Sequence, residues 1–413
     1  MSCEPQFSVE NISSYVLAVM GNRCQSEAIV VPTVIAYSLI FIIGTVGNIC
    51  TCVVITRNRS MHTHTNFYLF SLALSDLVVL FLGLPMELYG VIDFAYPYQF
   101  SEWVCKGRAY LIEFTSYASI LVICSFTVER WMAICHPLRS QSSPKVSRAY
   151  MTIMLMWTIS AISALPMGFI VKINRLPLPE WALDQPWIET VSEDYMTVKD
   201  TQFCAMDVDQ PEQQKRLIYF AFIAFFMVPA FLMTMMYCQI GARIAAKDSL
   251  LSVDKNEMRV KATHTAIRML ISVVVSFFLC WLPFHIQRLL SLFISYYEGN
   301  VSPAVETLFS LVYYISGCCY YSNSAMNPIL YNLFSAKYRK AFCVTILGRR
   351  VAMKIRPQWF SARSKLRSIQ DRSSRHFTSP NSSARFKLEK RPLCIKTNGI
   401  TNNGAIIPFN PTS

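Results

Sequence analysis

The sequence predicts an all-α membrane protein, a seven-transmembrane helix bundle with a short amphipathic eighth helix. Three observations support this prediction. The chain of 413 residues is 53% hydrophobic and only 15% charged, with a mean hydropathy of +0.34, whereas soluble domains carry about 25% charged residues. Seven apolar stretches reach the length of about 20 residues that a spanning helix needs. The loops that would lie on one side are rich in Lys and Arg, and the longest loop on the other side is acidic.

The seven stretches are expected to be helices, because the bilayer core offers no partner for unpaired backbone groups. A membrane barrel would instead require short segments of alternating polarity. The expected spans are Val31–Thr56, Asn66–Ile92, Val104–Cys135, Ala149–Val171, Leu217–Ile240, Ala266–Leu290 and Ala304–Leu333. We therefore expect an extracellular segment at 1–30, the bundle at 31–333, an amphipathic membrane-surface helix at 334–347 and a disordered basic cytoplasmic tail at 348–413.

Positive charge sets the expected orientation. The loops after the first, third and fifth spans and the segment after the seventh carry most of the Lys and Arg residues, which places them in the cytoplasm. From Lys337 onward the chain has 17 Lys and Arg against two acids, so the net charge of +13 predicts a lipid-facing basic tail and no nucleic-acid site. The amino terminus then lies outside. The first thirty residues lack a basic start followed by an apolar core, so the first span is expected to direct insertion.

The outer side of the protein is predicted to be acidic. The segment Lys172–Gln214 contains nine acids and three bases, a net charge of −6. Such a surface would steer a cationic partner toward the protein. The alternative is a solvated loop that is acidic without a binding role.

The fourteen cysteines suggest disulfides and no metal site, because the chain has no pair of Cys-x-x-Cys units. Cys105 and Cys204 are both predicted to lie outside, where a disulfide can form and would tie the long outer loop over the bundle. Cys3 and Cys24 are also predicted to lie outside, and the sequence leaves their pairing open.

Covalent modification is predicted at both ends of the chain. Asn11 starts an N-glycosylation sequon on the outer side. Cys343 follows an amphipathic run, which suggests a palmitoyl anchor on the inner leaflet, although an unmodified cysteine fits equally well. Several tail residues could take phosphate and so create a binding site for a partner protein. They are Ser373, Ser374, Thr378, Ser379, Ser382 and Ser383.

Single polar residues inside the apolar stretches carry the most information. A charge at the bilayer centre costs about 2.5–3.5 kcal/mol even on a lenient insertion scale, so Asp76 and Arg130 are expected to have a function. With their neighbours they form one motif in every span. The motifs are Gly47-Asn48, Leu72-Ala73-Leu74-Ser75-Asp76, Glu129-Arg130-Trp131, Trp157, Pro229 with Tyr237, Phe277 with Cys280-Trp281-Leu282-Pro283, and Asn327-Pro328-Ile329-Leu330-Tyr331. This ordered set, from Val31 to about Leu347, resembles the rhodopsin-like G-protein-coupled receptors.

The resemblance implies an activation switch. Arg130 would pair with Glu129 at rest, and on activation it would meet the G protein and Tyr237. One departure from the family pattern is Trp131, where the family usually has Tyr, which leaves basal activity and coupling open. Ile120, Pro229 and Phe277 would form a packing switch with Trp281 above it, although these residues could equally be core alone. The expected switch residues are Glu129, Arg130, Tyr237, Ile120, Pro229, Phe277, Trp281, Asn327, Pro328 and Tyr331.

Five oxygen-bearing residues are expected to meet in the middle of the bundle. They are Asp76, Ser119, Asn323, Ser324 and Asn327. Hard cations prefer such ligands, and the resemblance implies an allosteric sodium ion that stabilises the inactive state. The alternative is a hydrated polar network without an ion, and no other cofactor is expected.

Three charged residues in the outer halves of the spans point to a ligand pocket. Glu87 and Glu113 can together receive one guanidinium, since pairing between carboxylate and Arg is strong and directional. Arg288 could pair with one of them at rest, or bind a carbonyl or terminal amide of a ligand, because a buried charge needs a partner. Aromatic residues are expected to wall this pocket. They are Tyr110, Phe114, Tyr117, Phe284, Tyr313, Tyr314 and Tyr321.

The pattern PMELYG with Glu87, Glu113 and Arg288 resembles the neuromedin U and pyrokinin receptors, in a wider group with the ghrelin, motilin and neurotensin receptors. The resemblance implies a peptide ligand that ends in Pro-Arg-x-amide, and signalling at the plasma membrane through a heterotrimeric G protein, with Gq, phospholipase C and calcium favoured. A ghrelin-, motilin- or neurotensin-like peptide is the nearer alternative, and a membrane transporter is the remote one. The chain is not expected to be an enzyme, because it shows no nucleophile–base pair and no phosphate-binding loop.

Overall fold

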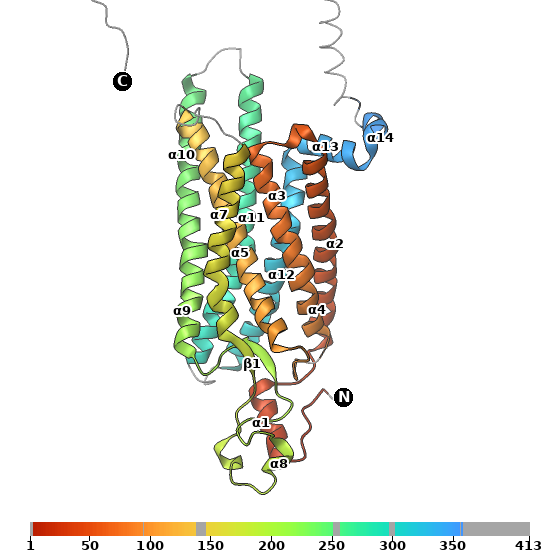
Figure 1. Ribbon diagram of the computed structural model, residues 1–413, viewed down its shortest axis with the longest axis vertical. Helices are drawn as coiled ribbons and strands as arrows, with labels where there is room; N and C mark the ends of the chain where they lie inside the picture. The colour runs from red at the N-terminus through yellow and green to blue at the C-terminus, as the bar shows by residue number, and fades with distance from the viewer. Residues whose placement is uncertain are drawn as a thin grey trace, which may run out of the picture. The chain divides into compact units, whose positions relative to one another are not determined.

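The computed structural model describes residues 3–93, 95–137, 146–250, 257–296, 302–355 and 357, which form a bundle of long helices (Figure 1). Six helical stretches within these residues are long and apolar enough to cross a membrane. They are α2 (Glu27–Arg57), α3 (His64–Val78) continuing through η2 (Val79–Gly83) into α4 (Leu84–Ile92), α5 (Glu102–Cys135), α7 (Val146–Ile170), α9 (Pro211–Phe222) continuing through η4 (Ile223–Met227) into α10 (Val228–Leu250), and α11 (Glu257–Tyr296). The seventh predicted span is α12 (Pro303–Phe334), a helix of 32 residues with more polar side chains. The predicted all-α membrane bundle is confirmed.

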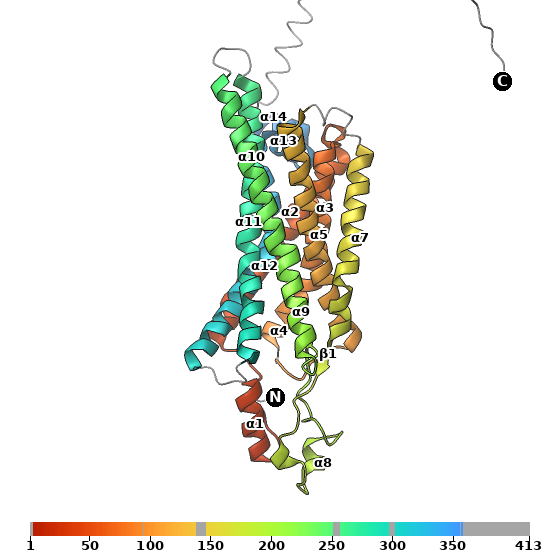
Figure 2. The ribbon, with the colours of Figure 1, turned by 90° about the vertical axis from the view of Figure 1, so that its left-hand side faces the viewer.

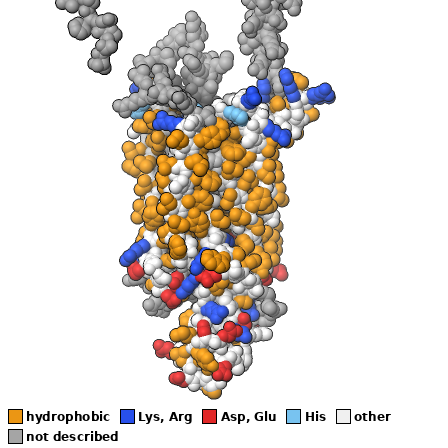
Figure 3. Space-filling model, viewed as in Figure 1, with side chains coloured by type: hydrophobic (Ala, Val, Ile, Leu, Met, Phe, Trp, Pro, Cys, Tyr) orange, Lys and Arg blue, Asp and Glu red, His pale blue; other side chains and the backbone are white. Residues whose placement is uncertain are grey.

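The bundle has the side-chain distribution of a protein that lies in lipid. A broad belt of hydrophobic side chains covers the face shown in Figure 3, with charged side chains above and below it. Ile42 and Leu279 are 58% and 65% exposed, whereas Asn48 and Asp76 are 0% and 2% exposed. Polar side chains inside the bundle bond to one another or to backbone carbonyls, because lipid offers them no hydrogen bonds, although some buried polar atoms have no partner among the described residues. α5 lies near the centre of the bundle and packs against α3, α7 and α10.

Two spans contain a π-helical turn that the sequence analysis did not predict. η2 ends two residues before Pro85, and η4 ends two residues before Pro229. A proline ring inside a helix clashes with the carbonyl four residues earlier. Those carbonyls belong to Phe81 and Phe225, which lie inside the π turns. The wider turn therefore accommodates each proline without ending the helix, and such turns are frequent at functional sites.

The end of the bundle that is predicted to lie outside, called the outer end below, carries a folded head that was not predicted. α1 (Glu10–Met20) packs against the loop at 176–198, which contains η3 (Glu180–Ala182) and α8 (Ile188–Val191), and Figure 2 shows α1 and α8 together beyond the end of the bundle. Their shared apolar core consists of Ile12, Val16, Tyr96, Leu176, Leu178, Ala182, Ile188, Val191 and Val198. The sequence analysis expected an extracellular segment at 1–30 and made no prediction about its internal structure.

A short hairpin and two disulfides connect the head to the bundle. β1 (Val171–Asn174) pairs antiparallel with β2 (Phe203–Met206), and Val171 faces Met206 in that register. The predicted disulfide between Cys105 and Cys204 is present and holds β2 against the start of α5. Cys3 and Cys24, whose pairing the sequence left open, are also bonded.

The opposite end carries short helices. η1 (Arg59–Met61) follows α2, and α13 (Ala336–Ile346) agrees with the predicted amphipathic helix at 334–347. The next helix, α14 (Gly348–Ile355), differs from the prediction that the disordered tail begins at residue 348. Its sequence alternates basic and apolar residues at helical spacing. The predicted phosphorylation sites from Ser373 to Ser383 lie outside the described residues.

Candidate functional site

A cavity of about 250 Å³ lies between the outer ends of the helices, and β2 forms part of its wall. All three charged residues singled out from the sequence line it. They are joined by Arg108, which the sequence analysis missed. The charged and aromatic lining consists of Glu87, Arg108, Glu113, Phe284, Arg288, Tyr313, Tyr320 and Tyr321.

Arg288 on α11 forms an ion pair with Glu113 on α5. The two side chains are 12% and 5% exposed, so the pair is largely shielded from water. The Arg288 guanidinium also lies 4.9 Å from the ring centroid of Phe284, a cation–π contact. Of the two sequence-based alternatives for Arg288, the internal pair with a glutamate is the one that this structure contains.

Glu87 forms a second ion pair, with Arg108 three residues after Cys105 on α5. These side chains are 19% and 27% exposed, and the Tyr313 hydroxyl donates to the Glu87 carboxylate at 3.4 Å. Arg108 could have been found by the rule that identified Arg288, since both are charges in the outer half of an apolar span. Glu87 and Glu113 each face their own arginine in this structure, and the expectation that they together receive one guanidinium of a ligand remains a prediction.

The predicted aromatic residues divide into two groups. Phe284, Tyr313 and Tyr321 line the cavity, together with Tyr320, which was not predicted. Tyr110, Phe114, Tyr117 and Tyr314 do not line it in the described part of the chain. Tyr117 instead stacks on Phe225, with ring centroids 3.7 Å apart. Tyr110 stacks on Phe114, and Tyr314 packs edge-on against Tyr313.

An aromatic chain leads from the cavity into the bundle. The ring centroid of Trp281 lies 5.7 Å from that of Phe284, 5.1 Å from that of Tyr320 and 5.4 Å from that of Phe277. Ile120 and Phe277 are both 1% exposed, and Pro229 is buried. A change in the position of Phe284 would therefore reach the predicted packing switch through Trp281, because a close-packed interior transmits strain.

The five predicted cation ligands are all buried. The Asn327 amide donates to Asp76 at 3.0 Å, and the Ser119 hydroxyl lies 2.9 Å from that of Ser75. The Asn48 amide donates to the carbonyl of Ser324 at 2.7 Å, and the Asn48 amide oxygen is buried without a hydrogen-bond partner among the described residues. One carboxylate among neutral oxygens fits a monovalent hard cation. No group of three or more His, Cys, Asp or Glu side chains that could hold a metal occurs in the described residues. Sodium remains a prediction.

The inner switch differs from the expected resting pair. Arg130 does not form an ion pair with Glu129 within the described chain. Its guanidinium bonds to Thr65 and lies 3.0 Å from the His64 ring nitrogen, while Glu129 accepts from the Tyr68 hydroxyl at 2.9 Å. Adjacent residues on a helix do not face each other, and the His64 ring, which also lies 3.8 Å from the Glu129 carboxylate, contacts both charged side chains.

Trp131 and the predicted switch residues Tyr237 and Tyr331 each contact a named partner. Trp131, the departure from the family pattern, donates from its indole nitrogen to the Gln239 side chain at 2.6 Å, which joins α5 to α10. The hydroxyl of Tyr237 lies 3.5 Å from that of Thr127. Tyr331 is 1% exposed and packs against Tyr338 of α13. Tyr331 and Pro328 both lie near the inner end of α12.

The two predicted modification sites are accessible. Asn11 is exposed on α1, beside the buried Ile12. Cys343 is a half-buried free thiol on α13. Glycosylation and palmitoylation at these residues remain predictions.

The known proteins to which this chain is similar agree with one another in their descriptions. A family model described as "7 transmembrane receptor (rhodopsin family)" matches residues 47–331. The neuromedin U receptor homolog nmur-2 of Caenorhabditis elegans is 55% identical over 353 residues, which is 85% of this chain and 88% of the relative. The pyrokinin-1 receptor of Drosophila melanogaster is 33% identical over 88% of this chain and 89% of the relative. Neuromedin-U receptor 2 of Rattus norvegicus is 34% identical over 75% of this chain and 74% of the relative.

Proposed function

The chain belongs to the rhodopsin family of seven-transmembrane receptors, and to the neuromedin U and pyrokinin receptor group within it, so we propose that it is a plasma-membrane receptor for a neuropeptide that ends in Pro-Arg-x-amide. The family is one of receptors and not of enzymes. The amino terminus and the head lie outside in this proposal, as the positive charge at the opposite end supports.

The observation that carries the proposal is the pair of acid–arginine contacts in the outer cavity. A ligand that carries one guanidinium can displace an internal arginine from one of the two glutamates and take its place. Arg108 and Glu87 are more exposed than Arg288 and Glu113, so opening the Arg108 pair costs less desolvation. The ligand arginine therefore replaces Arg108 at Glu87, next to the carboxylate of Glu113.

The charge of the cavity supports an amidated end. Its four charged side chains form two acid–arginine pairs, so a free terminal carboxylate that approached either arginine would be repelled by the acid already paired with it. A neutral amide avoids this repulsion, and its oxygen can accept from Arg288. One guanidinium nitrogen of Arg288 is buried without a hydrogen-bond partner within the described residues, so the donor is available. The acidic segment Lys172–Gln214 favours the approach of a cationic peptide.

Signalling follows from the position of the aromatic chain. A ligand that contacts Phe284 acts on Trp281 and Phe277, and thereby favours the bundle arrangement that binds a G protein at the inner end. The ligand and the G protein then strengthen each other's binding. A sodium ion at Asp76 favours the resting arrangement in this scheme. Coupling through Gq to phospholipase C and calcium, and later recruitment of arrestin, rest on the resemblance alone.

The proposal is tested by calcium release in cells that express the chain. A panel of amidated peptides ending in Pro-Arg-x is compared with the same peptides carrying a free carboxylate, or citrulline in place of Arg. We expect a potent response to the amidated Arg peptides and a strong loss with either change. A response only to ghrelin-, motilin- or neurotensin-like peptides, with surface expression confirmed, would replace the proposed ligand class.

A further inference from the structure

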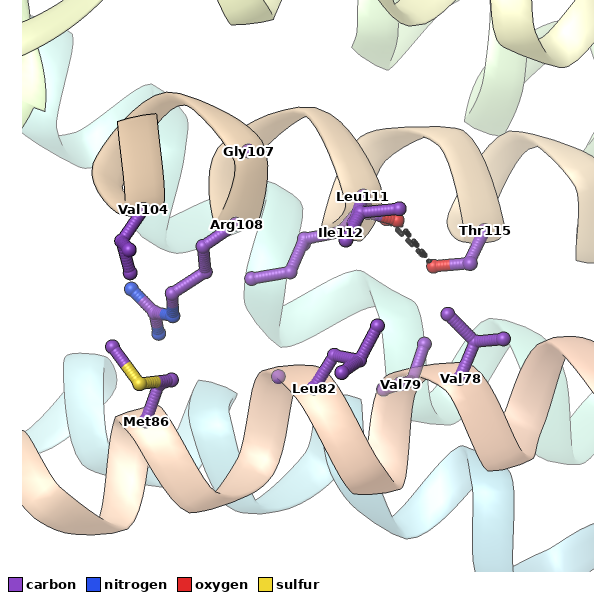
Figure 4. Close-up of a pocket in the computed structure, with 11 residues that line it drawn as sticks. Val78, Val79, Leu82, Met86, Val104, Gly107, Arg108, Leu111, Ile112 and Thr115 are labelled. Atoms are coloured by element: carbon purple, nitrogen blue, oxygen red, sulfur yellow. Dashed lines mark hydrogen bonds between the residues drawn. The ribbon is translucent and has the colours of Figure 1, made fainter. Parts of the chain in front are cut away.

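A second cavity opens between the second and third spans. Its volume is about 300 Å³, at the lower end of the range for small-molecule sites. Figure 4 shows the two stripes of side chains that form it, one from α5 and one from η2 with its flanking helices. The lining consists of Val78, Val79, Leu82, Gly83, Met86, Val104, Gly107, Arg108, Leu111, Ile112 and Thr115. We call this cavity the lateral groove.

The lateral groove borders the lipid-facing surface of the bundle. Leu82 and Val104 line it and are 50% and 38% exposed, although both are large apolar side chains within spanning segments. Its lining is apolar apart from Thr115 and Arg108, and the Thr115 hydroxyl is already bonded to the Leu111 carbonyl at 2.7 Å. A molecule that enters from the side therefore comes from the membrane and is mostly apolar.

Arg108 supplies the one unsatisfied polar group. Figure 4 shows its guanidinium between Met86 and Val104, at the end of the groove nearest the start of α5. Its Nε is buried and has no hydrogen-bond partner among the described residues. A buried donor without an acceptor costs about 1–3 kcal/mol. An occupant that places one acceptor there would remove this cost.

The occupant must be neutral, because the charge of Arg108 is already balanced by Glu87 and a second anion would repel that carboxylate. It gains most if its apolar body is rigid, since a flexible chain loses conformational entropy on binding. We propose that the lateral groove binds a membrane sterol, with the sterol hydroxyl accepting from Arg108 Nε and the ring system lying along the stripe from Met86 to Val78.

The groove and the outer cavity share a wall. Arg108 and Ile112 line both of them. A sterol that satisfies Nε stabilises Arg108 where it pairs with Glu87, so it favours the ligand-free arrangement. This regulatory consequence rests on the proposed function, whereas sterol binding itself does not.

Gly107 allows a direct test. It lines the groove, and a Cβ added to it would meet no atom within 4 Å. Gly107→Leu therefore adds a branched apolar side chain at the groove from a Cβ that has open space around it, and it should favour the helix, since Gly is a poor helix former. Gly90→Leu is the matched control. Gly90 also has open space around it, lies on α4 and does not line the groove.

The full chain is placed in phosphatidylcholine nanodiscs with a photoreactive cholesterol analogue, and the labelled peptides are mapped. We expect saturable labelling at 78–115 that unlabelled cholesterol competes away. Gly107→Leu should lower the apparent affinity of labelling about tenfold, which corresponds to ~1.4 kcal/mol, while Gly90→Leu leaves it unchanged. Equal labelling of the two variants, or better competition by oleate than by cholesterol, would overturn the sterol assignment.

The regulatory consequence is read out separately, as peptide affinity in nanodiscs with and without cholesterol. Cholesterol should weaken the binding of an amidated Arg peptide to the unsubstituted chain and have no effect on Gly107→Leu. Labelling without any change in peptide affinity would refute the coupling and leave the sterol site in place. Peptide binding that is absent altogether would refute the proposed function and not the labelling result.

Discussion

Replacing Arg108 by methionine should increase the affinity of the receptor for an Arg-containing peptide. The substitution keeps an unbranched apolar stem and removes the guanidinium that pairs with Glu87. A ligand arginine would then find an unpaired carboxylate, and would no longer have to displace an internal cation.

The size of the effect follows from the pair that is removed. Hydrogen bonds to charged groups contribute about 1.5–3 kcal/mol, and exposed ion pairs contribute about 0–1 kcal/mol. With Arg108 and Glu87 27% and 19% exposed, a value near 1.5 kcal/mol is appropriate, which corresponds to about a tenfold gain in affinity.

The assay is equilibrium binding to membranes of fixed lipid composition, with one amidated peptide in its Arg and citrulline forms. The ratio of the two affinities isolates the guanidinium, because changes in receptor folding or amount affect both peptides alike. The ratio should rise about tenfold in Arg108→Met. Arg288→Met should instead weaken both forms, since it removes the proposed partner of the amide. An unchanged or lower ratio in Arg108→Met would refute the exchange of internal for ligand arginine.

Three further predictions concern other parts of the chain. Glu113→Gln should weaken an Arg-containing peptide far more than its Arg-deleted analogue in the same binding assay, and equal losses would contradict a role for this acid in binding the guanidinium. Gly47→Ala should destabilise the bundle by about 1–3 kcal/mol, because the added Cβ would lie 2.7 Å from the rigid ring of Pro328. The control Gly90→Ala places its Cβ in open space and should be neutral or stabilising. Unfolding in mixed micelles measures the stability of both variants, and equal stabilities would show that the helix interface adjusts to the added methyl group. Hydrogen bonds from the side chain and backbone of Thr197 and the backbone of Met196 hold the pKa of Asp194 well below its usual range. The stability that Asp194 contributes is therefore fully present above the unfolded pKa of about 4 and is lost as pH falls below it. The protection factors of the outer-loop amides, which correct for the intrinsic pH dependence of exchange, should be constant from about pH 7 to 5 and fall only below about pH 4. A fall already near pH 6 would contradict this origin.

The bundle itself could be predicted because each span shows its length and its rare polar residues in the sequence. The prediction of Glu113 and Arg288 as pocket residues succeeded for the same reason, since a charged side chain in an apolar helix must face the interior of the bundle, where it can find a partner. Arg108 obeys the same rule, so it could have been found from the sequence.

Other features depended on partners that the sequence does not reveal. Arg130 meets His64 and Thr65 because α3 lies beside α5, and only tertiary packing decides whether those side chains or Glu129 reach the guanidinium. Tyr117 was expected to wall the pocket with the other aromatic residues, but its ring stacks on Phe225 in the π turn η4. The head was missed because its core residues come from three separate segments, α1, the loop that contains Tyr96 and the loop at 176–198. None of them has enough apolar surface to suggest a folded unit by itself.

The head also joins parts of the chain that are synthesised far apart in time. The hydroxyls of Ser8 and Thr190 lie 3.0 Å apart and are separated by 182 residues. At about 5–20 residues per second, these residues are made about 9–36 s apart. With the amino terminus outside, the first cysteines wait in an oxidising compartment before Cys204 arrives.

The separation of 21 residues between Cys3 and Cys24 allows this pair to close during that interval, and its closure removes two amino-terminal thiols that could otherwise bond to Cys105 before Cys204 emerges. We therefore expect the bond between Cys3 and Cys24 to reduce mispairing during biogenesis. A chain that lacks one of these two cysteines should accumulate as a wrongly bonded species in the secretory pathway, whatever its affinity for ligand once folded.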